Sequence, residues 1–550
     1  MMVEPPPAPT DCVDSARLMA TCAVMAERVK LSGTGDELAS LATIRQQLDA
    51  FGFHTATVMH DAYISLPGAA RVEVDDRAVT AITHSFSLSS PEAGLTGRLV
   101  RWDDTDAGDL AGCIALVDGI ASPAAADRLR RAGAVGQLHI SPHDHLHEMC
   151  ISPVWGNPGL STRPALPTTV ACTVSLTEGT MLLDQLRRGE QPVVTLHAQV
   201  DTGWRQTPIL VADLEPAATP GAPFVLLSGH HDTWYFGVMD NGAANATMLE
   251  CARVLALDRA SWRRGLRLCF WSGHSHGRYS GSAWYVDNHW AELDRRCAAH
   301  VNVDSTGGIG ATVMTNAGAA AELTPLAAAA IRQEMGLETG QVHAGKRLAR
   351  NSDNSFWGLG VPTMLGCLSL QPDTGPAMRN ALGWWWHTPE DLLDKIDPAH
   401  LVRDTRVFVA ALWRLLTDPV LPFDYAAHAT ALLQEVDAIG ATLGGALDLT
   451  PLITAASMVR DRAASLQSDD PARADRSLMG ASRALVPLDY TAGDRFAHDP
   501  ALPQTPWPVL DPIRALARAS PADRPFAAVD AVRARNRVLH ALQEAVQALT

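Results

Sequence analysis

The sequence lacks several features that would each indicate a particular class of protein. No stretch approaches the ~18 consecutive apolar residues that a membrane-spanning helix needs, so no membrane segment is predicted. The opening residues, MMVEPPPAPTDCVDS, have neither a basic start nor an apolar core, and we expect no secretory signal. Acidic residues outnumber basic ones by 60 to 44, and the resulting net charge of −16 disfavours nucleic acid or an anionic membrane as partner.

Cysteine pairs with metal-binding or redox spacing are also missing. The nine cysteines are an odd number, are scattered along the chain and include no CxxC motif. This usage favours reduced thiols and a cytoplasmic location. With 47% apolar and 19% charged residues over 550 positions, the chain has the composition of a globular protein of several domains.

The pattern of predicted strands and helices divides the chain into three parts. Buried β runs alternate with helical patterns from about 224 to 421, which predicts an α/β domain with a mainly parallel mixed sheet and helices on both faces. Short β runs around one or two helices, from about 97 to 200, look like an insertion into this domain. We therefore expect an α/β domain of residues 1–64 and 205–425, a β-rich insert at 65–204, and a helical C-terminal domain at 426–550.

Residues that can bind a metal follow the predicted strands of the α/β domain. Because ligand sites lie at the carboxyl ends of parallel strands, side chains in these positions should meet at one rim. Histidine and aspartate together suit zinc, cobalt, manganese or iron, and one carboxylate can bridge two ions. The rim segments are His230–Asp232, Asp240–Gly242, His274–His276, Asn302–Ser305 and His387–Asp391.

The segment around His387 carries the signals of a helix start. Thr388 can act as the N-cap, Pro389 suits the first helical position, and Asp391 can complete a pair resembling a capping box. The pattern predicts that His387 lies at the entry of a helix.

Several of these segments resemble a known family of metalloenzymes. HHDTWYFGVMDNGAANATMLECARVLA, NVDST, RNSDNSFWGLGVP and WWHTPEDLLDKID are similar to the co-catalytic zinc aminopeptidase family, and within it to the glutamate carboxypeptidase II and transferrin receptor branch. In the insert, GCIALVDG, AGAVG and PALPTTV resemble a protease-associated domain. The resemblance covers nearly the whole chain. It implies a zinc aminopeptidase-like fold and a C-terminal helical domain that makes a homodimer.

Transferred residue by residue, the resemblance implies a two-metal site. His230 and Asp304 would be terminal ligands of one metal, Asp240 the bridging carboxylate, and His387 a ligand of the second metal. Asp232 would orient His230 from behind and raise its basicity.

The segment after the second strand departs from the family. Where the family has two adjacent glutamates, a general base and a ligand of the second metal, this chain has FWSGHSHGRYSGS without any acidic residue. Alignment on Gly281–Ser282 places Ser275 at the base position and His276 at the ligand position. Alignment on Phe270 instead places His276 at the base position. A serine hydroxyl is no general base near neutral pH, so His274, His276 or hydroxide on the metal would have to serve.

The residues leave three functions open. The first is a metal-dependent hydrolase that cleaves an amide bond in a peptide or small molecule. The second is a non-peptidase metalloenzyme on the same scaffold, such as a lyase or acyl transferase acting on a small molecule. The third is a non-catalytic homologue resembling transferrin receptor, although that function would not require the ligand positions to persist.

Cofactor and substrate expectations follow from the same residues. We expect one or two divalent transition metals, with zinc preferred, and iron or manganese as alternatives at a site of His276, His387 and Asp240. Aromatic residues near the rim, Trp234 and Trp386, can line a substrate pocket. Arg278 and Tyr279, in the altered loop, can orient an anionic substrate or an oxyanion.

Overall fold

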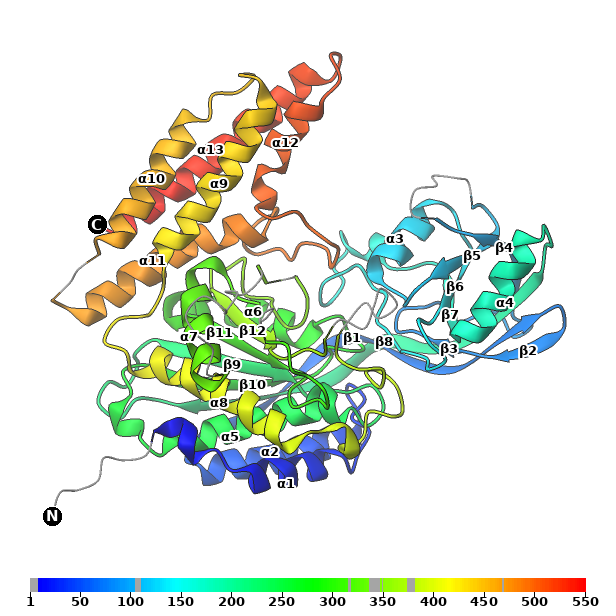
Figure 1. Cartoon of the computed structure of the whole chain (residues 1–550), viewed down its shortest axis with the longest axis horizontal. Helices are drawn as coiled ribbons and strands as arrows, with labels where there is room; N and C mark the ends of the chain where they lie inside the picture. The colour runs from blue at the N-terminus through cyan, green and yellow to red at the C-terminus, as the bar shows by residue number, and fades with distance from the viewer. Residues whose placement is uncertain are drawn as a thin grey trace.

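The computed structural model describes residues 8–103, 110–314, 318–335, 347–348, 350–372, 381–466 and 469–550. Figure 1 shows a central α/β domain, a β-rich insert on one side of it, and a bundle of long C-terminal helices that stands off its upper end. The α/β fold and the helical C-terminal region agree with the prediction.

The central sheet supplies the rim that the sequence predicts. Its parallel strands lie in the order β12–β11–β9–β10. All residues of β9, β10 and β11 are buried, as expected for parallel strands covered on both faces. Two long strands, β1 and β8, continue the sheet in antiparallel pairing beside β10. These strands are β1 (His54–Val74), β8 (Val193–Leu214), β9 (Phe224–His230), β10 (Gly265–Trp271), β11 (Cys297–Asp304) and β12 (Thr363–Cys367).

Helices cover both faces of this sheet. One apolar core joins the central strands to α1, α2, α5, α7 and α8, and a second core joins the opposite face to α6. Their bounds are α1 (Ser15–Met25), α2 (Gly35–Ala50), α5 (Ala244–Ala256), α6 (Ser280–Arg296), α7 (Thr324–Met335) and α8 (Pro398–Thr417).

The insert shares its two longest strands with the central domain. β1 and β8 extend beyond the central sheet and continue into a smaller sheet in the order β8–β4–β5–β6–β7–β3, while β2 pairs with β1. The expected insert boundaries lie opposite each other on this ribbon, since Ile64 pairs with Gly203. The remaining elements are β2 (Arg77–Thr80), β3 (Ile82–Thr83), β4 (Leu95–Arg101), β5 (Cys113–Asp118), α3 (Pro123–Arg131), β6 (Gly136–Ile140), β7 (Val170–Val174) and α4 (Leu176–Arg187).

The described part of the C-terminal region, residues 425–466 and 469–550, contains five α-helices. Its α9 is shorter than the apolar pattern over 426–447 suggests, because Gly444 adopts a left-handed conformation with φ 56° and ends the helix. A buried ion pair between Arg264 and Asp475 connects the bundle to the α/β domain. The helices are α9 (Tyr425–Leu443), α10 (Thr450–Ala464), α11 (Pro471–Tyr490), α12 (Asp511–Arg518) and α13 (Arg524–Ala548).

The helix start predicted at Thr388 is wrong. Turns and a bend occupy residues 384–390, a short 3-10 helix covers Leu393–Lys395, and α8 begins only at Pro398, where the Asp397 carboxylate accepts the N–H groups of Ala399 and His400. The Thr388 hydroxyl accepts from the N–H of Glu390 at 3.2 Å, as an N-cap would, and donates to the carbonyl of Trp385, but no α-helix follows it directly. His387 itself has a left-handed backbone with φ 59°, so a turn presents its side chain.

The described residues also bear on the expectations for membrane segments and for cysteines. Among these residues, no helix combines the length and the apolar character that crossing a membrane would require. All nine cysteines are free thiols.

Buried His60 makes the stability of the fold sensitive to acid. It lies on β1, donates to or accepts from Thr207 across the ribbon at 3.0 Å, and stacks on Trp284. Burial lowers its pKa to about 4, and the carbonyl of Asp61 offsets only part of that effect. Between pH 6.5 and 4 the unfolded chain therefore binds a proton at His60 that the folded chain does not, and stability falls as the pH falls.

We expect the thermal midpoint to fall between pH 7 and pH 4, and to fall less in His60→Gln. Each pKa unit of the difference corresponds to about 1.4 kcal/mol, so His60 contributes roughly 1–3 kcal/mol to the change. Thermal unfolding followed by circular dichroism at several pH values measures it. The control, His540→Gln, changes an exposed histidine on α13 and should keep the wild-type slope. An unchanged slope in His60→Gln would contradict the assignment.

Candidate metal centre

Four predicted ligand residues meet at the carboxyl ends of the central strands. His230 is the last residue of β9 and Asp304 the last of β11. Asp240 comes from the connection between β9 and α5, and His387 from the turn that precedes α8. Parallel pairing of β9 with β11 brings these ends together, as the sequence predicts.

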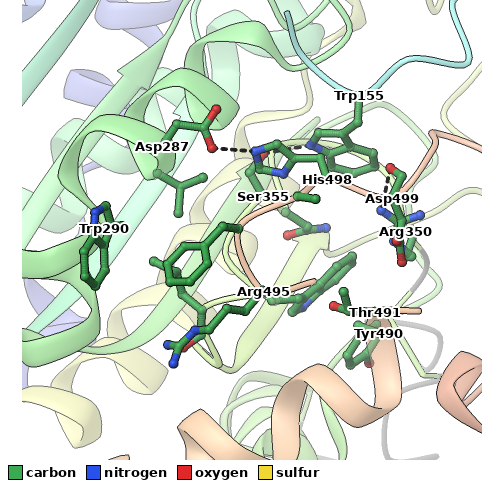
Figure 2. A pocket seen from close by; sticks show the side chains of 17 residues that line it. Trp155, Asp287, Trp290, Arg350, Ser355, Tyr490, Thr491, Arg495, His498 and Asp499 are labelled. Carbon is green, nitrogen blue, oxygen red and sulfur yellow. Dashed lines mark hydrogen bonds and ion pairs between the residues drawn. The ribbon is translucent and has the colours of Figure 1, made fainter. Parts of the chain in front are cut away.

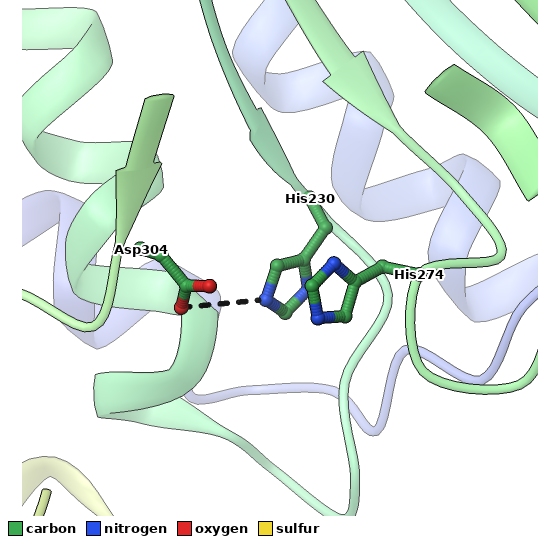
Figure 3. Close-up of side chains that lie close together, drawn as sticks. All are labelled: His230, His274 and Asp304. Atoms are coloured by element: carbon green, nitrogen blue, oxygen red, sulfur yellow. Dashed lines mark ion pairs between the residues drawn. The ribbon is translucent and has the colours of Figure 1, made fainter. Parts of the chain in front are cut away.

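The Asp240 carboxylate lies between two imidazoles. Its Oδ1 is 3.0 Å from Nε2 of His230, and its Oδ2 is 3.1 Å from Nε2 of His387. Asp304 approaches His230 from another side, with Oδ1 at 3.7 Å from the same Nε2 (Figure 3). One carboxylate thus has an oxygen directed to each of two histidines, which is the arrangement of a bridging ligand.

Backbone carbonyls fix both histidines from behind. Nδ1 of His230 donates to the carbonyl of Asp232 at 2.8 Å, and Nδ1 of His387 donates to the carbonyl of Glu148 at 2.7 Å. Because a carbonyl can only accept, each Nδ1 carries the proton and each Nε2 presents its lone pair when the ring is neutral. Neutral histidine held in this way is the form that binds metals.

Two aspartates outside the cluster hold its parts in place. The Asp391 carboxylate accepts the N–H groups of Met239 and Asp240, which fixes the turn that carries Asp240. Burial raises the pKa of Asp391 to about 7 despite these two bonds. The Asp232 carboxylate accepts from the backbone N–H groups of His274 and Ser275, so it anchors the altered loop. The sequence predicts that Asp232 orients His230, and in the structure the backbone carbonyl of Asp232, not its carboxylate, makes that contact.

The donor set fits a divalent transition metal. Nε2 of His230 and Oδ1 of Asp240 are buried and only 3.0 Å apart, yet neither makes a hydrogen bond of acceptable geometry. They converge on a common point rather than on each other. Burial lowers the pKa of His230, but the adjacent Asp240 and Asp304 carboxylates outweigh it and raise this pKa well above its usual range. Two buried carboxylates therefore require a positive charge here, and zinc, manganese or iron accept these donors.

His274 belongs to this cluster. Its ring stacks on that of His230 with centroids 3.7 Å apart, and one ligand atom each from His230, His274 and Asp304 lies within 4.8 Å of the others (Figure 3). Nδ1 of His274 is 2.8 Å from Oδ2 of Asp353, a buried carboxylate. His274 is thus the residue of the altered loop that reaches the predicted ligands.

His276 has a different position from the one expected of a ligand of the second metal. Its ring is fully buried, with Nδ1 2.9 Å from the Ser32 hydroxyl and 3.6 Å from the Asp232 carboxylate. Within the described parts of the chain, the ion pairs of Asp240 involve His230 and His387 but not His276. Because Asp232 binds the backbone N–H groups at 274 and 275, the side chain of His276 points into the protein interior. There its ring packs against Trp234, with centroids 4.5 Å apart.

A cavity of about 860 Å³ opens in front of the cluster. The hydroxyl of Ser275 is buried without a hydrogen-bond partner, and Ser275 lines this cavity. All four residues expected to contact substrate line it too. The described residues around it include Trp234, Asp240, His274, Ser275, Arg278, Tyr279, Asp304, Trp386 and His387, but His276 is not among them.

The residues that sequence reasoning missed are those that support the site from a distance. Asp353 lies in the RNSDNSFWGLGVP segment, whose polar residues carry no spacing signal that would connect one of them to His274. Glu148 acts through its backbone carbonyl, so its side-chain identity gives no signal at all.

Comparison with known proteins gives the relationship of the central domain. Residues 210–412 match the model of Peptidase family M28. "Probable glutamate carboxypeptidase VP8" of Zea mays is 29% identical over 238 residues, which are 40% of this chain and 32% of that protein. "Aminopeptidase NAALADL1" of Mus musculus is 27% identical over 141 residues, 25% of this chain and 18% of that protein. The matches span about a third or less of the length of these relatives.

Solved structures show the same fold. An aminopeptidase from Aneurinibacillus sp. strain AM-1 aligns with 74% of this chain and 95% of its own, at 21% identity and a TM-score of 0.56. A peptidase M28 precursor from Shewanella amazonensis SB2B aligns with 74% of this chain and 94% of its own, at 19% identity and a TM-score of 0.59. The mixed α/β sheet with its covering helices is therefore the fold of these two proteins.

Proposed function

We propose that this chain, whose residues 210–412 belong to Peptidase family M28, is a metal-dependent hydrolase that cleaves an amide bond in a short peptide or small molecule. The observation that carries the proposal is the Asp240 carboxylate, placed between His230 and His387 with Asp304 beside it. The cluster faces a cavity large enough for such a substrate.

The geometry of the cluster supports one assignment of ligand roles. His230 and Asp304 would hold one metal, His387 would hold a second, and Asp240 would contribute one oxygen to each. When bound, such a metal polarises the scissile carbonyl and makes water a better nucleophile. Zinc is our first choice, and manganese or iron accept the same donors.

A second candidate is a non-peptidase metalloenzyme, such as a lyase or acyl transferase acting on a small molecule. It is favoured by the 272–279 loop, which has histidine and serine where the family has two glutamates. A non-catalytic role like that of transferrin receptor is less well supported, because it would not need convergent buried ligands. Bound metal separates the non-catalytic role from the other two, and product analysis separates hydrolysis from lyase or transferase chemistry.

Protein purified without chelator should contain one or two equivalents of a divalent transition metal. His387→Ala should lower that content, because the side of Asp240 that faces His387 loses its nitrogen donor. The control, His289→Ala, changes a histidine that packs against Tyr285 outside the cluster and should retain the wild-type metal content. Elemental analysis measures both. Only traces of metal in the wild type, with no uptake of zinc, manganese or iron, would contradict the proposal.

Arg278 lines the cavity, and no described carboxylate forms an ion pair with it. Its Nε is buried without a hydrogen-bond acceptor. The other arginine at this cavity, Arg347, is bonded to Asp489 at 2.7 Å. Arg278 and Tyr279 both have left-handed backbones, and the N–H of Gly156 in the insert donates to the carbonyl of Arg278. The backbone of the loop is held in place, and the Arg278 guanidinium is free to bind an anionic group of the substrate.

We expect the enzyme to prefer an N-acyl amino acid or short peptide with a free carboxylate over its carboxamide. A charged hydrogen bond contributes about 1.5–3 kcal/mol, so the preference in kcat/KM should be roughly 10- to 100-fold. Arg278→Ala should remove the preference mainly through KM, and Arg278→Lys should keep part of it. Steady-state kinetics on matched acid and amide pairs give the answer. Equal preference in wild type and Arg278→Ala would exclude this role.

Two tryptophans complete the wall of the cavity. Trp386 stacks on His387 with ring centroids 3.5 Å apart, and Trp234 lies 5.4 Å from the same imidazole. We assign them to contacts with the apolar part of the substrate. For the location of the protein we propose the cytoplasm, which suits nine unpaired cysteines.

We also propose a homodimer that uses residues 426–550. On α13, Phe526, Val529 and Val532 are 75%, 50% and 37% exposed, at a spacing that places them along one side of the helix. Such an exposed apolar row is typical of an interaction surface.

Light scattering should give about twice the mass of the 58.8 kDa chain. Phe526→Asp should shift the protein to the monomer, because it places a charge in the apolar contact. Leu160→Asp changes a 91% exposed leucine of the insert and should leave the mass unchanged. A wild-type protein that is monomeric at micromolar concentration would refute the dimer.

A further inference from the structure

The altered loop carries a histidine whose imidazole is paired with a buried carboxylate. Nδ1 of His274 is 2.8 Å from Oδ2 of Asp353, and Asp353 is fully buried. The other oxygen of that carboxylate, Oδ1, accepts the hydroxyl of Ser282 at 2.8 Å. Both oxygens are thus occupied, and the carboxylate cannot rotate without losing a bond.

A chain of hydrogen bonds leads from Trp155 to Asp353, and its shortest contacts indicate the direction of the protons. The indole N–H of Trp155 can only donate, and it donates to the hydroxyl of Ser355 at 2.9 Å (Figure 2). The hydroxyls of Ser355 and Ser282 are 2.9 Å apart. Because Ser282 donates to the carboxylate, it accepts from Ser355. These donors therefore point from Trp155 through Ser355 and Ser282 toward an oxygen of Asp353.

This direction determines the tautomer of His274. With Asp353 accepting at both oxygens, Nδ1 of His274 is the donor of their shared hydrogen bond, and Nε2 presents its lone pair. The ring is held over His230 by stacking and faces Tyr279 edge-on at 4.9 Å. His274 lines the cavity that contains the predicted ligands, and its side chain is 15% exposed. A substrate in the cavity can therefore reach this imidazole.

Resting on the hydrolase function proposed above, we propose that His274, positioned by Asp353, is the proton acceptor that replaces the missing glutamate of the loop. As the oxygen of the attacking water bonds to the carbonyl carbon of the amide, one O–H bond breaks and its proton moves to Nε2 of His274. When the C–N bond breaks, that proton passes from Nε2 to the leaving nitrogen. Water and amide become a carboxylic acid and an amine, and His274 returns to its neutral form.

Asp353 is a positioning residue in this scheme. It does not face the cavity, and it acts by keeping the proton on Nδ1 and by balancing the charge of the imidazolium that forms. Ser282 acts one step further back, because it holds Asp353. The effects of substitution should therefore decrease from His274 to Asp353 to Ser282.

The first test separates a proton acceptor from a metal ligand. His274→Ala should keep the wild-type metal content and lose about 10²–10⁴-fold in kcat with little change in KM, because a positioned general base contributes that much. Added imidazole should restore part of the rate. Loss of the metal in His274→Ala would show that His274 is a ligand, and an unchanged kcat would show that it is not the acceptor. Either result would overturn the inference.

The second test reads the tautomer directly and needs no substrate. In the full-length protein labelled with ¹⁵N-histidine, His274 should show a protonated Nδ1 and a bare Nε2. Asp353→Asn should lose this signature and most of kcat at nearly constant KM, and Asp353→Glu should recover part of both. The control Asp394→Asn changes an exposed aspartate paired with Lys395 and should alter neither. A His274 protonated on Nε2 in the wild type would refute the scheme.

These outcomes are distinct from a failure of the proposed function. If the wild-type protein binds no metal and releases no amine or acid from any amide, the hydrolase proposal fails. If it binds metal and hydrolyses amides while His274→Ala does so equally well, only the role of His274 fails.

Discussion

Two buried carboxylates, Asp240 and Asp304, face the same imidazole, and the need to balance their charge organises the structure around them. A carboxylate removed from water is costly unless positive or hydrogen-bonding groups surround it. A bound cation would supply that charge, and His230 and His387 present their Nε2 lone pairs to it because a backbone carbonyl fixes each ring through Nδ1. The strand ends, the turn before α5 and the turn before α8 must all be in place for this balance to exist.

The insert is part of the centre rather than an attachment to it. The carbonyl of Glu148 orients His387, and Trp155 begins the hydrogen-bond network that ends at Asp353. The N–H of Gly156 holds the carbonyl of Arg278 and so shapes the altered loop. Residues far apart in the sequence therefore act on the same few atoms, and the α/β domain alone would lack three of these supports.

The sequence predicts the parts of the site whose identity and spacing are both fixed by chemistry. His230, Asp240, Asp304 and His387 follow strands or turns in a recognisable order, and the structure brings them together. The helix start at Thr388 fails because a good capping sequence competes with a tertiary contact. Asp391, expected to help cap that helix, instead binds the backbone N–H groups at Met239 and Asp240. The local sequence cannot show that the Asp391 carboxylate will bind backbone N–H groups about 150 residues away in the chain.

The loop between β10 and α6 is the other place where sequence reasoning reaches its limit. Neither the Gly281–Ser282 turn nor Phe270 fixes the register of the histidines, because Asp232 sets it by binding the backbone at 274 and 275. His274 is thereby directed to the cavity and His276 to Ser32. Contacts to the backbone do not depend on residue type and give no signal in the sequence. Which of the residues 274, 275 and 276 faces the cavity is therefore seen only in the folded chain.

The ribbon formed by β1 and β8 has a mechanical consequence. It runs unbroken from the central sheet into the insert except at one irregularity, where the register shifts between Pro67 and Ala70. A ribbon of two strands is stiff along its length and bends most easily where its hydrogen bonding is interrupted. Any rotation of the outer insert about this hinge would pull on the loops that carry Glu148 and Trp155 together. The orientation of the insert and the alignment of the candidate metal ligands would then change together.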